Sequence, residues 1–145
     1  MGVFTRRWGA LAAFWLSSTL PQIVSAAEPC KLLTAQELSQ VLGASVSPKP
    51  AGTTGCLWEG NPIRVNIGLR DAKVWPRITA TGPRITKTDV SGLGDAAQFS
   101  GMDNIWTLSV KQGASVIVLT VLGTKSADQQ RSMEESLARL ALKRL

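Results

Sequence analysis

Residues 105–122 read Ile-Trp-Thr-Leu-Ser-Val-Lys-Gln-Gly-Ala-Ser-Val-Ile-Val-Leu-Thr-Val-Leu, and this stretch decides the fold. Two runs rich in apolar and β-branched residues, 105–110 and 115–122, flank a turn around Gln112-Gly113, a pattern typical of an antiparallel hairpin. With a two-residue loop, one face collects Trp106, Leu108, Val110, Ile117, Leu119 and Val121. We therefore expect a sheet that is buried on this side.

Two amphipathic helices are predicted to supply the cover. The first, over about 35–42, opens with the capping box Thr34-Ala-Gln-Glu37 and stops at Gly43. The second runs over about 127–142 after a capping signal at Ser126. Its apolar stripe consists of Met133, Leu137, Leu140 and Ala141. Both stripes suit packing against one face of a sheet.

The rest of the mature chain is predicted to add short strands. These are 56–59, 63–70, 84–90 and 96–99. Residues 44–55, rich in Pro and Gly, are interpreted as a surface loop with an extended piece at 44–47, and 72–80 as a helical turn. The predicted fold is α+β, with a single antiparallel sheet of four to six strands, two amphipathic helices packed on one face, and one disulfide.

The N-terminus has the features of a secretory signal peptide. Arg6 and Arg7 precede nine residues without a polar side chain, 8–16, and Val24-Ser-Ala26 offers a cleavage site. The apolar run is about half of the roughly 20 residues that span a bilayer. We expect a signal peptide over 1–26, removed after Ala26, and a single domain over 27–145. The ordinary secretory route is favoured, and twin-arginine export, for which Thr5-Arg6-Arg7 is the signal, is the alternative. This predicts a periplasmic or secreted protein with no stable membrane span after cleavage.

Composition restricts the chemistry of the chain. Its 145 residues include no His and two Cys, which excludes Ser-His, Cys-His and His-metal sites as well as a Cys₄ metal site. No metal or cofactor is predicted. Removal of Arg6 and Arg7 leaves 14 basic against 10 acidic side chains, a charge of +4. This charge is too dilute for a nucleic-acid protein, so no nucleic-acid partner is expected.

Cys30 and Cys56 are 26 positions apart. In an oxidising compartment an even pair is most simply one disulfide. The alternative is a redox-active pair, for which a close spacing such as Cys-x-x-Cys is usual. Trp58 shares a strand face with Cys56 and is expected in the core, with a ring-stacking platform for a sugar as the alternative.

Several short motifs together resemble one group of proteins. They are Cys30-Lys-Leu-Leu-Thr34, Gly55-Cys-Leu-Trp58 and Gly92-Leu-Gly-Asp95, followed by a strand pair and a helix. Over nearly all of its mature length the chain resembles small secreted or lipid-anchored bacterial envelope proteins of unknown function. The resemblance implies an α+β domain with a disulfide between the two cysteines, and it brings no catalytic residues. The chain lacks the lipoprotein cysteine signal that many such proteins carry.

The favoured function is an exported, non-catalytic binding module of the cell envelope. Its partner would be an envelope component, a small ligand or a protein. We expect a ligand surface where loops 44–55, 71–83 and 91–104 converge, since loops carry binding on rigid sheets. The candidate anion contacts are Arg64, Arg70, Arg77 and Arg84, and the candidate stacking group is Trp75.

The alternative is a small carboxylate-dependent hydrolase acting on envelope glycans. Glu59 and Asp95 are its candidate pair. Glycoside hydrolysis needs two carboxyl groups that face each other about 5–9.5 Å apart across a cleft. The position of these two side chains in the fold therefore decides whether this pair can act.

Overall fold

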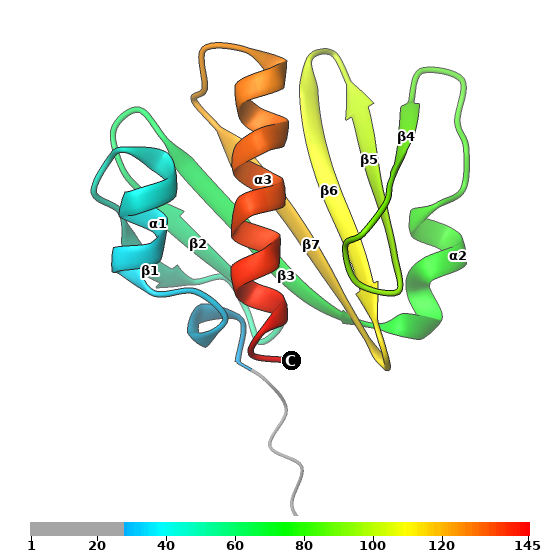
Figure 1. The fold of residues 1–145 in the computed structure, drawn as a ribbon, viewed down its shortest axis with the longest axis horizontal. Helices are drawn as coiled ribbons and strands as arrows, with labels where there is room; N and C mark the ends of the chain where they lie inside the picture. Colours follow the sequence, from blue (N-terminus) through cyan, green and yellow to red (C-terminus); the bar gives the residue numbers. More distant parts are fainter. Residues whose placement is uncertain (1–27) are drawn as a thin grey trace, which may run out of the picture.

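The structure, a computed structural model, describes residues 28–145. The signal peptide predicted for 1–26 lies outside this range. A seven-stranded antiparallel sheet in the order β1-β2-β3-β7-β6-β5-β4 forms the centre of the fold (Figure 1). Its strands are β1 (Ser47–Pro50), β2 (Gly55–Glu59), β3 (Arg64–Asp71), β4 (Thr86–Val90), β5 (Ala96–Met102), β6 (Ile105–Gln112) and β7 (Ser115–Leu122). The α+β class is confirmed, but the prediction of four to six strands is wrong.

The additional strand is β1, which lies within the segment predicted to be a loop. Its two prolines, Pro48 and Pro50, suggested a loop because proline removes a ladder donor. The N–H of Ala51 donates to the carbonyl of Gly55 at 3.1 Å. Because bonding alternates along an antiparallel strand, the nitrogens of Pro48 and Pro50 point away from β2. An edge strand tolerates proline in this orientation.

The sheet consists of two meanders that join in the middle. β1-β2-β3 forms one meander and β4-β5-β6-β7 the other. They meet at β3 and β7, whose ladder runs from Arg64↔Leu122 to Asp71↔Ser115. The link from β3 to β4 contains a short 3₁₀ turn, η2 (Ala72–Val74), and the one-turn helix α2 (Trp75–Ile78), at the predicted helical turn.

The predicted central hairpin is confirmed. Leu108 pairs with Leu119 and Val110 with Ile117, and all four side chains are fully buried. The loop consists of Gly113-Ala114, one residue later than the expected Gln112-Gly113, since Gln112 pairs with Ser115. Gly113 has φ 56°, a left-handed conformation that glycine adopts without cost.

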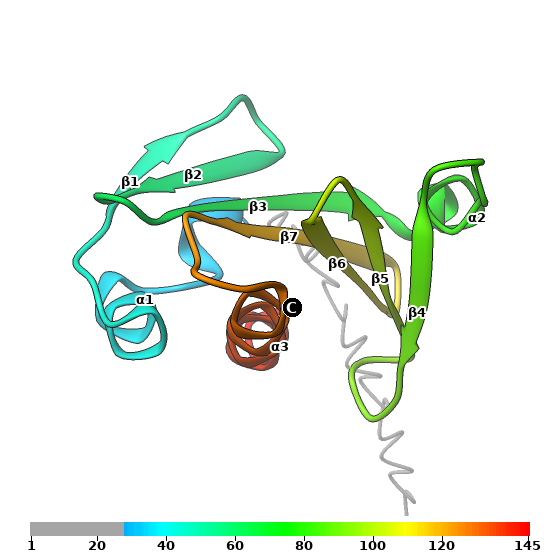
Figure 2. The same cartoon turned by 90° about the horizontal axis from the view of Figure 1, so that it is seen from above.

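Two helices cover one face of the sheet, as predicted. α1 (Ala35–Leu42) and α3 (Ala127–Leu142) lie on the same side (Figure 2). The capping box is present: the Glu37 N–H donates to Thr34 Oγ1 at 3.2 Å, and the Thr34 N–H donates to Glu37 Oε2 at 2.9 Å. α2 lies toward the opposite face, where Lys87 Nζ donates to the Ile78 carbonyl at 2.7 Å. Within residues 28–145, no helix is long and apolar enough to cross a membrane.

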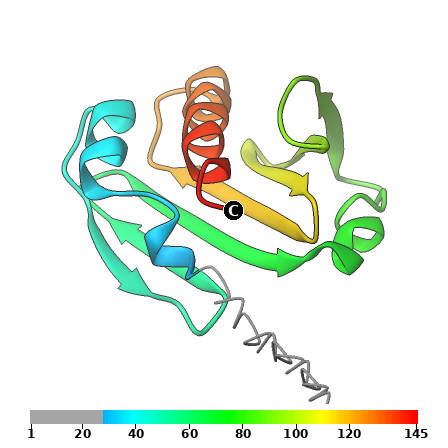
Figure 3. The ribbon, with the colours of Figure 1, turned by 60° about the horizontal axis from the view of Figure 1, so that its bottom comes forward.

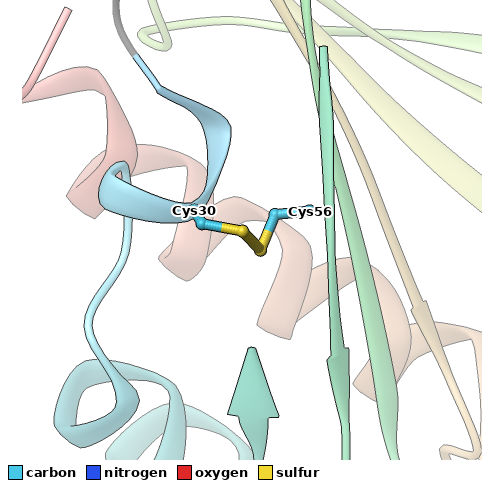
Figure 4. Close-up of a disulfide and its surroundings, with 2 residues drawn as sticks. All are labelled: Cys30 and Cys56. Carbon is cyan, nitrogen blue, oxygen red and sulfur yellow. A yellow bond between two sulfur atoms is a disulfide. The ribbon is translucent and has the colours of Figure 1, made fainter. Parts of the chain in front are cut away.

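A disulfide attaches the start of the described chain to the sheet. Cys30, in the 3₁₀ turn η1 (Pro29–Lys31), is bonded to Cys56 of β2 (Figure 4). The predicted pairing is therefore confirmed. Trp58, two residues beyond Cys56, is 3% exposed and belongs to the core. Its ring is not available as a stacking platform.

Candidate functional site

A groove runs between α3 and the β4–β6 end of the sheet. α3 stands between α1 on one side and this end on the other (Figure 3). Two hollows of about 370 and 350 Å³ lie along the groove. The first is lined by Thr88, Asp89, Val90, Ser91, Phe99, Arg131 and Glu135. The second is lined by Arg84, Thr86, Gly101, Met102, Asp103, Asn104 and Trp106.

The Trp106 ring is held in a fixed position in this groove. The Arg131 guanidinium lies 4.8 Å from the ring centre, within cation–π range. Phe99 packs edge-to-face against the ring, with 6.3 Å between the ring centres. On the strand side the ring lies over Gly101, where a Cβ would come within 2.7 Å of its atoms. The Trp106 ring, which lines the second hollow, is thus in contact with Arg131, which lines the first.

Beneath this stack, two side chains of α3 replace part of the sheet. The β6–β7 ladder stops at Leu108↔Leu119, and the strands separate under α3 (Figure 1). The Trp106 N–H donates to Gln130 Oε1 at 3.4 Å, and Gln130 Nε2 donates to the Trp106 carbonyl at 2.8 Å. The Val121 N–H donates to Glu134 Oε1 at 2.8 Å. The side chains of Gln130 and Glu134 therefore satisfy strand groups that a ladder would otherwise pair.

Glu134 is the buried acid of the domain. It is 0% exposed, and its Oε1 also accepts a hydrogen bond from Gln130 Nε2 at 2.9 Å. Its Oε2 is buried without a hydrogen-bond partner among the described residues. Burial raises the pKa of Glu134 from 4.5 to about 7, and the hydrogen bonds from Val121 and Gln130 lower it only in part. This carboxyl therefore holds Gln130, which in turn bonds the Trp106 backbone, and it does not line the groove hollows.

Of the predicted anion contacts, Arg64 and Arg70 are both on β3. They lie near opposite ends of the strand, on the face away from α1 and α3. Arg70 Nη1 donates to the carbonyls of Thr54 and Leu69, beside a hollow of about 390 Å³. Among the described residues, Arg64 makes no ion pair.

Trp75 and Arg77 lie on α2, and Arg84 lies just before β4. Trp75 is half-buried and Arg77 is exposed. Neither of them lines the groove hollows, whereas Arg84 does. The structure therefore places one of the five candidate ligand contacts in the groove and distributes the other four over β3 and α2.

The loops predicted to converge do so only in part. Thr53 and Thr54 meet Asp71 at the Arg70 hollow. Asp95 approaches the same end of the sheet, because its Oδ2 accepts a hydrogen bond from the Gly113 N–H at 2.7 Å. The Gly92-Leu-Gly-Asp95 motif is a tight turn with Leu93 2% exposed. Burial of Leu93 and the left-handed conformation of Gly92 and Gly94 account for these residues without a ligand.

Glu59 and Asp95, the pair considered for a hydrolase, lie at opposite ends of β7. Glu59 pairs with Arg64, which pairs with Leu122 at the end of that strand. Asp95 holds Gly113, just before its start. An eight-residue strand is about 24 Å long, far beyond the about 5–9.5 Å that glycoside hydrolysis requires. These two carboxylates do not share a site.

Trp106, Arg131, Gln130 and Glu134 were missed as site residues. Trp106 was assigned only to the core face of the hairpin. The signal for the buried pair was available, because positions 130 and 134 fall on the same helical stripe as Leu137 and Ala141. Polar residues on a buried stripe are unusual and point to specific hydrogen-bond partners.

Within residues 28–145, no group of three or more Cys, Asp or Glu side chains could hold a metal ion. Comparison of the chain with protein-family models, curated proteins and solved structures gives no match.

Proposed function

We propose that this protein is an exported, non-catalytic binding module of the bacterial cell envelope, with its ligand site in the groove between α3 and β4–β6. The Cys30–Cys56 disulfide is compatible with an oxidising compartment outside the cytoplasm. The signal-peptide pattern and the resemblance to small envelope proteins support the same location. The ligand would be an envelope component, a small molecule or a protein segment.

The observation that carries the proposal is the fixed Trp106–Arg131 stack. Gly101, Phe99 and Arg131 hold the indole from three directions, so little ordering is needed when a ligand arrives. Arg84 adds a second guanidinium to the groove. The expected ligand therefore carries an anionic group together with an apolar part.

The Arg70 hollow supports a ligand site less well. It offers one guanidinium, and Nη1 of that group is already bound to two backbone carbonyls. The groove hollows offer the Arg84 guanidinium, which makes no ion pair among the described residues, and a second guanidinium, Arg131, which pairs with Asp128. We therefore favour Arg84 and Arg131 over Arg64 and Arg70 as ligand contacts.

The test is capture from detergent-solubilised native envelope with the immobilised mature protein. Arg84→Ala/Arg131→Ala removes both groove cations, and Arg64→Ala/Arg70→Ala removes the same number of charges from the other face. We expect the groove variant to capture at least tenfold less material than the wild type, and the matched variant to capture as much as the wild type. Captured ligand that depends only on Arg64 and Arg70 would move the site to the open face. Equal capture by all three proteins would contradict the proposal.

A further inference from the structure

The two edges of the sheet are unlike in their hydrogen-bonding capacity. At the β1 edge, Pro48 and Pro50 direct nitrogens without hydrogen outward, which blocks the addition of another strand. The β4 edge has no proline within Thr86–Val90. Among the described residues, β4 makes no backbone hydrogen bonds beyond its ladder to β5. Alternate N–H and C=O groups of β4 are thus left without a partner strand.

Charged side chains that project past an edge strand often prevent another strand from pairing with it. The charged side chains of β4 do not project in this way. Lys87 Nζ is bound to the Ile78 carbonyl, and Asp89 Oδ1 accepts a hydrogen bond from Gln98 Nε2 at 2.9 Å. Both side chains are therefore held by neighbours within the domain, instead of projecting past the edge as charges that repel a strand.

The same strand forms one wall of the groove. Thr86, Thr88 and Val90 alternate with Lys87 and Asp89, and they pair with Gly101, Phe99 and Ala97 of β5, whose buried side faces α3. A chain added beside β4 would alternate in the same way. Every second side chain of that chain would point toward the groove.

The two groove hollows are lined by side chains of both charges. Arg84 makes no ion pair among residues 28–145. Arg131 pairs with Asp128 of its own helix, which is largely exposed. Arg84 and Arg131 line separate hollows, and Asp103 shares the hollow of Arg84. Glu135 shares the hollow of Arg131 and pairs with Arg139 of its own helix. A carboxylate beside β4 would form charge-assisted hydrogen bonds with Arg84, which lines its hollow together with Thr86 of β4.

We propose that β4 receives an extended segment of a protein partner as an eighth strand, with an Asp or Glu side chain against Arg84. This inference rests on the proposed function, because it specifies the ligand of the same groove. A row of free backbone donors and acceptors matches another backbone better than it matches a small molecule. Strand addition of this kind draws its affinity from the ladder and its specificity from alternate side chains.

The experiment uses random nine-residue peptides displayed on phage and selected against the exported protein, produced from the full chain. Selected sequences are then synthesised and titrated into ¹⁵N-labelled protein. We expect an Asp or Glu in the selected peptides and chemical-shift changes concentrated at the amides of 86–90. Arg84→Ala should weaken binding at least tenfold. Arg64→Ala, the matched exposed arginine on β3, should leave it unchanged.

The strand itself is tested by N-methylation of the peptide, one position at a time. A ladder predicts alternating sensitivity, with at least tenfold loss at every second position and little at the positions between. Uniform tolerance of N-methylation, or selection of no peptide, would overturn the inference even if envelope capture still depended on Arg84 and Arg131. In that case the proposed function would stand without it. Binding at the β1 edge would also overturn the inference.

Discussion

Glu134 and Gln130 supply the hydrogen bonds that a paired strand would supply at the point where β6 and β7 separate. One carboxylate oxygen of Glu134 accepts from both Val121 and Gln130, and the other has no partner among the described residues. Gln130 in turn bonds both backbone groups of Trp106. The position of the groove indole is therefore coupled to a buried acid that does not contact the groove.

Glu134→Gln should remove a pH dependence of stability. The pKa of Glu134 is raised from 4.5 to about 7 by burial, so the folded protein keeps a proton that the unfolded chain loses between these values. The free energy of unfolding should fall by about 3 kcal/mol as the pH rises from 4.5 to 7, and stay constant with respect to this group outside that window. Above pH 7 the Gln variant should be more stable than the wild type.

Urea denaturation at pH 5 and pH 8 measures this difference. Glu135→Gln, at the next position of α3, provides the matched control and should retain the wild-type pH slope. If Glu134→Gln also kept the wild-type slope, Glu134 would not be the group that binds the proton.

Gly101→Ala should displace Trp106. The added Cβ would lie 2.7 Å from the ring, and relief of this overlap costs about 1–3 kcal/mol in a packed region. We expect a lower melting temperature, a changed tryptophan fluorescence spectrum and loss of groove binding. In Gly68→Ala the new Cβ would lie no closer than 3.4 Å to the Arg70 guanidinium, an ordinary contact distance, so this variant should be near neutral. A Gly101→Ala protein with wild-type stability and fluorescence would contradict this packing.

At the scale of elements, the sequence predicted what local patterns encode. α1, α3 and the β6–β7 hairpin follow from capping residues and apolar periodicity, and their bounds agree closely with the structure. β1 was missed because its proline orientation depends on the neighbouring strand. The predicted apolar stripe of α3 is also rotated slightly from the face that is buried in the structure. Met133 and Leu140 are half-buried, whereas Glu134 is fully buried. The groove was missed because strand order, which places β4 opposite α3, is not a local property.

The capping box of α1 gives a test at this scale. Thr34→Ala removes the acceptor of the Glu37 N–H and should lower the free energy of unfolding by about 1 kcal/mol. Ser39→Ala deletes a hydroxyl that only bonds the Ala35 carbonyl within the same helix, and we expect a change within about 0.5 kcal/mol. Chemical denaturation of both variants measures the two free energies of unfolding. Equal losses would show that the Thr34 cap stabilises the protein no more than the Ser39 hydroxyl does.

At the scale of the whole molecule, the N-terminal segment is held at two places. Cys56 binds it to β2, and Arg144, beyond α3, donates to the Leu32 carbonyl at 3.1 Å and to Glu37 Oε1 at 2.9 Å. The Arg144 guanidinium also lowers the pKa of Glu37 below 4.5. Leu32 and Leu33, each 1% exposed, fill the core between these attachments. The first meander and the final helix are thus joined through the segment that contains η1 and α1.

Cys30→Ala/Cys56→Ala should therefore loosen the molecule unevenly. The bond closes a loop with a sequence separation of 26, for which chain entropy predicts a loss of about 3.5 kcal/mol on removal. Amide exchange should accelerate most at 29–42, where the segment keeps only the Arg144 contacts and its own packing. The β5–β6 pair, whose ladder lies on the far side of β7, should show only the general loss of stability. If exchange accelerated equally in both regions, the disulfide would act on the global equilibrium alone and not as a local attachment of this segment.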